Sequence, residues 1–108
     1  MKFLITLFAI MTFALPSWAA EIQMGYDGNL VFEPSEVSIA SGEAVTFINN
    51  DLPPHNVVFV NGHDELSRPD LNFTKGDEVQ ITFDEPGDYE FQCEPHAGAG
   101  MKGVIHVS

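Results

Sequence analysis

The sequence predicts an all-β fold, a β-sandwich of seven or eight strands. Apolar and polar residues alternate with a period of two in several short segments, which is typical of half-buried strands. Turn signals rich in glycine, asparagine and proline separate these segments. The segments show no helical periodicity, so no helix of any length is expected. Short strands at this spacing favour two packed sheets.

The alternation is clearest at residues 36–39, 44–48, 78–83 and 89–93. Shorter candidate strands lie at residues 21–24, 30–32, 56–60 and 104–107. Residues 61–77 have the weakest pattern, with Pro69 and mixed charges. They are expected to form a long connection with room for one irregular edge strand.

Residues 1–19 have the pattern of a secretory signal peptide. Lys2 precedes an apolar run at residues 3–15, and a helix break and a small-x-small cleavage motif follow. Cleavage after Ala19 is favoured over cleavage after Ala20, which would put the bulky Trp18 where a small side chain is needed. A retained anchor is the alternative, but the run is shorter than the roughly 20 residues of a bilayer crossing. We expect an exported protein whose mature form, residues 20–108, is one domain not inserted in a membrane.

The chain is strongly acidic, with a formal net charge of −12 at pH 7. Nucleic acids and anionic membranes are therefore poor partners, because their phosphates would be repelled. A basic protein partner is compatible with this charge. The acidity could equally serve only to keep a small exported monomer soluble, and charge alone does not separate the two interpretations.

Cys93 is the only cysteine, so no internal disulfide can support this small domain. A domain of this size has a marginal core, and a bound metal would supply the missing support. A lone cysteine could instead be a buried spectator or form an intermolecular bridge. Its sequence neighbours decide between these alternatives.

His96 and Met101 follow Cys93 at C-x2-H-x4-M spacing, on a loop whose two glycines allow a tight curl. His55 begins an apolar strand elsewhere in the chain. Two imidazoles, a thiolate and a weak axial thioether form the ligand set that suits a copper ion cycling between two oxidation states. Zinc would favour a further cysteine, histidine, carboxylate or water over the thioether. Asn56 is expected to brace the site by hydrogen bonding.

Other chemistry is less well supported. A nucleophilic pair of Cys93 with a histidine lacks basic or oxyanion-stabilising neighbours, so we expect no enzyme activity. His63 and His106 have no partner ligands at a useful spacing and are expected at the surface.

The segments Pro-His-Asn-Val-Val-Phe at 54–59 and Cys-Glu-Pro-His-Ala-Gly-Ala-Gly-Met at 93–101 resemble the two copper-binding segments of the plastocyanins. The likeness covers nearly all of residues 20–108, including segments 28–35 and 46–50. It implies a Greek-key, cupredoxin-like sandwich with a blue (type 1) copper site. It also implies that the edge of His96 reaches the surface inside a flat apolar patch. The positions that match this patch are Gly28, Leu30, Pro54, Pro95, Gly98 and Ala99.

The implied function is that of a soluble electron carrier, which shuttles single electrons between redox proteins such as c-type cytochromes. The periplasm is the expected compartment, or the thylakoid lumen in a photosynthetic organism. Gln92 departs from the tyrosine that plastocyanins usually carry before the copper cysteine, and the segment from His55 to Cys93 is shorter, as in amicyanin and pseudoazurin. Photosynthetic service is therefore left open.

The alternative function is a periplasmic copper-binding protein that stores or delivers the metal. Such proteins more often display exposed clusters of methionine and histidine. Residues 20–108 contain only Met24 besides Met101, which favours the carrier.

Overall fold

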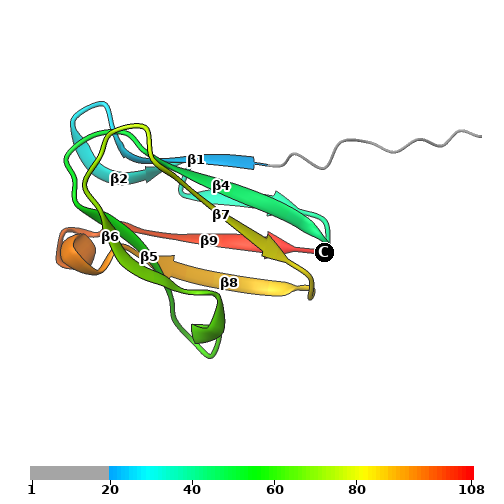
Figure 1. Ribbon diagram of the computed structural model, residues 1–108. Helices are drawn as coiled ribbons and strands as arrows, with labels where there is room; N and C mark the ends of the chain where they lie inside the picture. The colour runs from blue at the N-terminus through cyan, green and yellow to red at the C-terminus, as the bar shows by residue number, and fades with distance from the viewer. Residues whose placement is uncertain (1–19) are drawn as a thin grey trace, which may run out of the picture.

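The computed structural model describes residues 20–108, and the expected signal peptide at 1–19 lies outside the described residues. Two sheets pack face to face as a β-sandwich, which confirms the predicted fold class (Figure 1). One sheet has the strand order β2-β1-β4-β7 and the other the order β3-β9-β8-β5-β6. The strands are β1 (Ala20–Tyr26), β2 (Asn29–Glu33), β3 (Glu36–Ile39), β4 (Glu43–Asn49), β5 (His55–Phe59), β6 (Arg68–Asn72), β7 (Glu78–Phe83), β8 (Gly87–Gln92) and β9 (Lys102–Val107).

The described chain thus has nine strands, which are the eight segments predicted from the sequence and one more. The additional strand is β6, inside the segment where an irregular edge strand had room. β6 lies at the edge of its sheet, and its pairing with β5 is interrupted by a register shift. Four of its five residues are exposed, so no alternation of apolar and polar residues marks it in the sequence.

The chain crosses repeatedly between the two sheets, so strands that are distant in sequence become neighbours. β1 pairs in parallel with β4, and β3 pairs in parallel with β9. β5 and β8 pair antiparallel, with Val58 opposite Gln92 and Phe59 opposite Phe91. This last pairing brings the two segments with predicted ligands to the same end of the sandwich.

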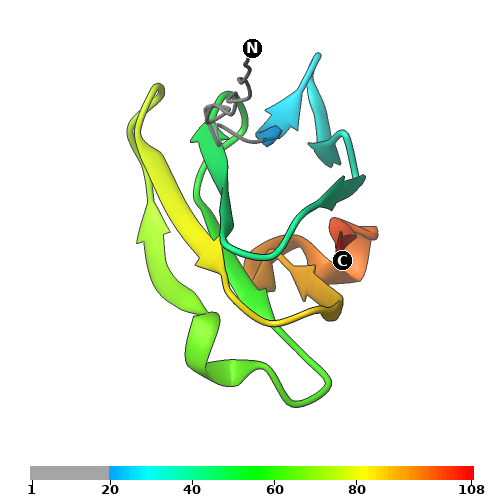
Figure 2. The ribbon, with the colours of Figure 1, turned by 90° about the vertical axis from the view of Figure 1, so that its right-hand side faces the viewer.

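The core between the sheets is rich in aromatic rings. Figure 2 views the ribbon roughly along the strands. Phe91 packs edge-on against Phe32 and Phe47, with ring centroids 4.7 Å and 5.3 Å apart. It also contacts Phe59 at 5.8 Å. Because Phe91 lies two positions before Cys93, this cluster gives the end of β8 a rigid support.

Two short 3-10 helices interrupt the loops of the described chain, η2 (Asp64–Leu66) and η3 (Glu94–Ala99), so the expectation of no helix is wrong. η3 has Pro95 in its first turn and ends at Gly100, whose φ of 91° is left-handed. Within residues 20–108, no helix has the length and apolarity needed to cross a membrane.

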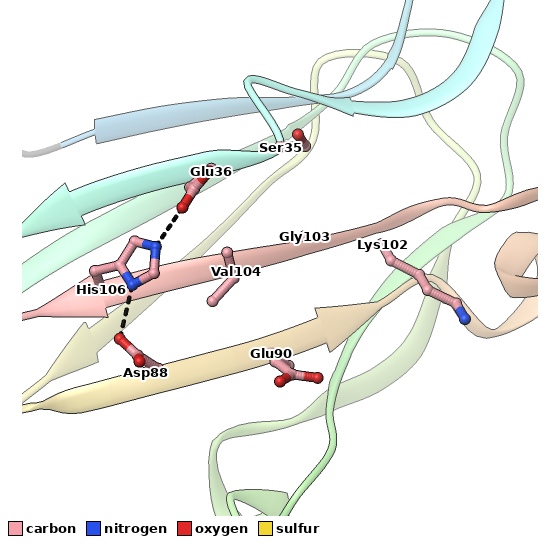
Figure 3. A pocket seen from close by; sticks show the side chains of 8 residues that line it. All are labelled: Ser35, Glu36, Asp88, Glu90, Lys102, Gly103, Val104 and His106. Carbon is pink, nitrogen blue, oxygen red and sulfur yellow. Dashed lines mark hydrogen bonds and ion pairs between the residues drawn. The ribbon is translucent and has the colours of Figure 1, made fainter.

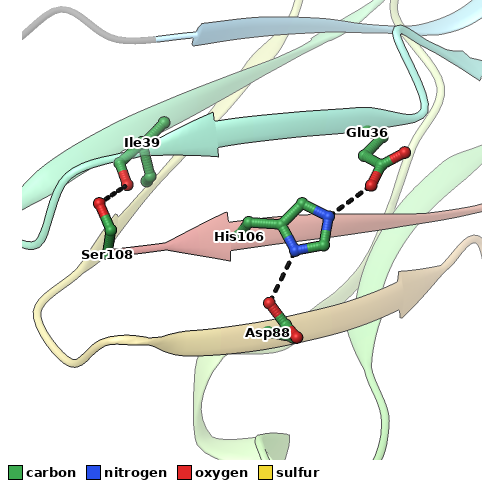
Figure 4. A network of polar contacts seen from close by, with 5 residues as sticks. All are labelled: Glu36, Ile39, Asp88, His106 and Ser108. Atoms are coloured by element: carbon green, nitrogen blue, oxygen red, sulfur yellow. Dashed lines mark hydrogen bonds and ion pairs between the residues drawn. The ribbon is translucent and has the colours of Figure 1, made fainter.

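His106 on β9 contacts side chains of both neighbouring strands, β8 and β3, on an exposed face of the sheet. Its Nδ1 lies 2.7 Å from a carboxylate oxygen of Asp88 on β8, and its Nε2 contacts Glu36 on β3 (Figure 4). Both ring nitrogens face acceptors, so only the imidazolium satisfies both contacts. These hydrogen bonds, first that of Asp88 and then that of Glu36, raise the pKa of His106 above its ordinary value. The sequence analysis placed His106 at the surface but did not predict its contacts with these two carboxylates.

A shallow pocket adjoins the His106 contacts on the same sheet face (Figure 3). Its lining comes from β3, β8, β9 and the residue before β3, and includes none of the predicted copper ligands. The lining residues are Ser35, Glu36, Asp88, Glu90, Lys102, Gly103, Val104 and His106.

His106→Gln should lower the free energy of unfolding most below about pH 6.5, where the imidazolium is present in both the folded and the unfolded chain. A raised folded-state pKa stabilises the fold below the unfolded pKa, and this contribution is lost as pH rises through the folded pKa. The difference from the wild type should therefore shrink by pH 9. Urea unfolding of both proteins in the same metal-loaded form measures it.

The matched control places His106→Gln in a Glu36→Gln/Asp88→Asn background, where the carboxylates are absent. There the effect of His106→Gln should no longer depend on pH. A pH dependence that persisted in that background would show that other groups cause it.

Candidate metal centre

Three predicted ligands converge at one end of the sandwich. His55 is the first residue of β5, Cys93 follows the last residue of β8, and His96 lies on η3. Their ligand atoms all lie within 4.8 Å of one another. His55 and Cys93 are fully buried, and His96 is half-buried.

The distances among these atoms match those of ligands around one metal ion. Nδ1 of His55 lies 3.7 Å from Sγ of Cys93, and Nδ1 of His96 lies 3.5 Å from it. With metal–sulfur and metal–nitrogen bonds of about 2.3 Å and 2.0 Å, tetrahedral to trigonal angles separate two ligands by roughly 3.5 to 3.7 Å. Both histidine–cysteine distances therefore fit ligands that share one transition-metal ion.

The ring of His55 is held in the orientation that a ligand needs. Its Nε2 lies 2.5 Å from the carbonyl oxygen of Asp51, which can only accept, so Nε2 carries the proton. The lone pair of the neutral ring is then on Nδ1, facing Cys93. Burial lowers the pKa of His55, the bond to Asp51 opposes this, and His96 adds to the lowering. Both the tautomer and the protonation state therefore suit metal binding.

Burial raises the pKa of the Cys93 thiol, while the backbone N–H groups of Asn56 and His96 act in the opposite direction. A thiol in this environment keeps its proton at neutral pH unless a cation replaces it. Within the described chain, no lysine or arginine is among the groups that shift its pKa. A metal ion is the counter-charge that this site accommodates.

Met101 closes the ligand loop and is fully buried. Its carbonyl oxygen accepts from the backbone N–H of Cys93 at 3.1 Å, and its own N–H donates to the carbonyl of His96 at 3.3 Å. These two hydrogen bonds hold the backbone of Met101 next to those of Cys93 and His96, the other two ligands of the motif. A buried thioether in this position favours copper over zinc.

Asn56 ties the two ligand segments together, which confirms the predicted brace. Its Oδ1 accepts from the backbone N–H of Glu94 at 2.8 Å. Its Nδ2 donates to the carbonyl of Pro69 at 3.0 Å and to the Glu94 carboxylate at 3.1 Å. Because Asn56 follows His55 and Glu94 follows Cys93, the brace fixes the distance between two ligands.

Two features of the site are not apparent from the sequence. The carbonyl of Asp51 is a backbone group, so the identity of its side chain gives no signal for the bond to His55. Leu52, next in the chain, is 37% exposed and belongs to the same loop, yet it was not among the predicted patch residues. An apolar residue three positions before His55, within a Leu-Pro-Pro run, was the available signal.

Comparison with known proteins places this geometry in context. Residues 20–108 match the family model described as copper binding proteins of the plastocyanin/azurin family. The chain is 48% identical over 104 residues to the chloroplastic plastocyanin of Physcomitrium patens, covering 83% of this chain and 58% of that protein. It is 45% identical over 98 residues to plastocyanin A/B of Petroselinum crispum, covering 82% and 100% of the two chains.

Solved structures show the same relationship. A mutant plastocyanin of fern superposes with a TM-score of 0.73 at 30% identity, covering 82% of this chain and 99% of the other. The amicyanin of Paracoccus versutus superposes with a TM-score of 0.71 at 31% identity, covering 87% and 85%.

Asn56→Ala should destabilise the protein by about 1 to 3 kcal/mol, because it leaves the Glu94 N–H and the Pro69 carbonyl without their partner. Denaturant unfolding measures the loss. Asn29→Ala is the matched control, since Asn29 is exposed and bonds the carbonyl of Asp27 two residues away. Equal losses in the two variants would contradict a bracing role for Asn56.

Proposed function

The chain belongs to the plastocyanin/azurin family of copper-binding proteins, and on that premise we propose that it is an exported carrier of single electrons. In this proposal His55, Cys93, His96 and Met101 hold one copper ion. The convergence of three ligand atoms at the buried end of the sandwich is the observation that carries it. No enzymatic step is part of the proposed function.

Copper bound by these residues would supply a one-electron couple between its two oxidation states, and two imidazoles, a thiolate and a methionine thioether suit that couple. The protein's own contribution is to hold the ligands still while the charge changes. β5, the end of β8 and the Asn56 brace all resist movement of the ligand atoms. A site that moves little on reduction keeps the barrier to electron transfer low, which distinguishes a carrier from a protein that must release its metal.

His96 offers the route by which an electron enters and leaves. Its ring is half-buried, whereas His55 and Cys93 are enclosed. Around it, Pro95, Gly98 and Ala99 are exposed, and all three are small and uncharged. A partner can approach such a surface without desolvating a charge.

The proposed partners are redox proteins such as c-type cytochromes. They would dock on the apolar patch formed by Leu30, Pro54, Pro95, Gly98 and Ala99, to which the exposed Leu52 adds. η3 and the turn between β1 and β2 lie at the same end of the molecule, opposite the C-terminus (Figure 1). The strong negative charge would steer a basic partner from a distance, with a range that salt shortens to about 8 Å at physiological ionic strength.

We also propose that residues 1–19 direct export and that the mature chain begins at Ala20. The periplasm is the proposed compartment, or the thylakoid lumen if the source is photosynthetic. Sequencing the N-terminus of the exported protein tests this proposal, and a mature chain that retained residues 3–15 would contradict it.

Loading with Cu(II) should give an intense blue colour that bleaches reversibly on reduction, and Cys93→Ser should abolish the colour because the thiolate is its source. Absorption spectroscopy of both proteins, with unfolding curves to show that the variant is folded, makes the measurement. A Cys93→Ser protein that stayed blue would exclude this site. A colourless wild type that exchanges Cu(I) readily would favour copper storage or delivery instead.

Leu30→Glu should slow electron transfer to a cytochrome several-fold, with absorption and potential nearly unchanged, since no ligand is altered. Val31→Glu is the matched control, because it introduces the same charge one position further along β2. Side chains alternate along a strand, so the side chain at position 31 points to the opposite face of the sheet from that at position 30. Stopped-flow kinetics at several salt concentrations compares the two variants. Equal slowing by both would show that charge alone, and not the patch, governs docking.

A further inference from the structure

Gly25 lies in β1, a strand that carries none of the four proposed ligands. It is buried, and its φ of 78° is left-handed. The pairing of β1 with β2 shifts register between Met24 and Tyr26, so Gly25 occupies a β-bulge. Glycine is the usual residue in a left-handed bulge position. Backbone conformation therefore gives one reason for a glycine here.

Close packing gives a second and independent reason. A Cβ at position 25 would lie 1.9 Å from the carbonyl oxygen of Asp51 and 2.8 Å from Nε2 of His55. Relieving the first contact would require the Asp51 carbonyl to retreat by roughly 1 Å or more. The loop is not free to do so, because the N–H groups of Asn50 and Asp51 both donate to the carbonyl of Met24, at 3.0 Å and 3.2 Å.

We propose that Gly25 is a positioning residue for the proposed copper ligand His55. Its lack of a side chain lets the Asp51 carbonyl lie against β1. That carbonyl accepts from Nε2 of His55 and turns Nδ1 toward Sγ of Cys93, 3.7 Å away. Gly25 thus acts on the site through the Asp51 carbonyl. Its role presupposes the copper site proposed above, because orienting His55 matters only if His55 binds the metal.

Gly25→Ala tests this role against Gly42→Ala. Gly42 also has a left-handed φ, of 90°, but a Cβ there would meet nothing within 4 Å. Both variants carry the conformational strain of alanine at positive φ, and only Gly25→Ala carries the clash. Differences between the two variants therefore report on the contact with Asp51 and His55.

Two spectroscopic readouts follow the ring of His55. In the metal-free protein, the Nε2–H proton of His55 should give a slowly exchanging NMR signal in the wild type and in Gly42→Ala. That signal should shift or disappear in Gly25→Ala. In the Cu(II) form, the visible band and the EPR hyperfine splitting should change only in Gly25→Ala. Spectra of Gly25→Ala that matched those of Gly42→Ala would overturn the proposal.

A measurement on the wild type covers the case in which Gly25→Ala does not fold. Nitrogen-15 chemical shifts of the metal-free protein should show the ring of His55 protonated at Nε2 and unprotonated at Nδ1, because the Asp51 carbonyl accepts from Nε2. A ring protonated at Nδ1 would show that the Asp51 carbonyl does not orient His55, and the proposal would fail.

A separate measurement tests the proposed copper function. A wild-type protein without the intense visible band would refute the copper carrier whatever the variants show. The metal-free NMR comparison would still decide whether Gly25 sets the orientation of His55.

Discussion

The antiparallel register between β5 and β8 is the constraint on which the rest of the structure depends. With Val58 opposite Gln92, the start of β5, which carries His55, lies beside the end of β8, which leads into Cys93. Both ligands therefore lie at one end of the sandwich. A slip of one residue would turn every side chain of β5 to the opposite face. His55 would then move away from Cys93, and Asn56 would lose the hydrogen bond that it accepts from the backbone N–H of Glu94. Packing of Phe59 and Phe91 in the core, 5.8 Å apart, holds the register in place.

Much of this architecture could be predicted because burial imposes a period of two on the central strands. Val45 and Phe47 in β4, and Ile81 and Phe83 in β7, alternate with exposed or half-buried neighbours. The sequence left room for the edge strand β6 within residues 61–77 but did not fix its position, because an edge strand need not bury either face. Its Arg68, Pro69, Asp70 and Leu71 are all exposed and leave no periodic signal.

The candidate site was predictable to a similar extent and for a similar reason. Metal chemistry restricts ligands to a few side chains, so Cys93, His96 and Met101 stand out by type and spacing. The pairing of His55 with them is a tertiary contact, for which the residue types gave the only clue. The contribution of Asp51 is a backbone carbonyl, and that of Gly25 is an absent side chain. Neither contribution depends on a side-chain type, so no residue pattern predicts it.

The carboxylate clamp on His106 also bears on which sites of this protein are open to copper. An imidazole binds a metal through a lone pair, and the imidazolium has none to offer. Asp88 and Glu36 favour the charged ring, so this histidine is closed to a passing ion over a wider pH range than a free one. At the other end of the molecule, burial and the Asp51 carbonyl keep His55 neutral with Nδ1 unprotonated. The two environments thus act in opposite directions: the carboxylates keep His106 protonated and unable to bind a metal, whereas burial keeps His55 neutral and able to bind one.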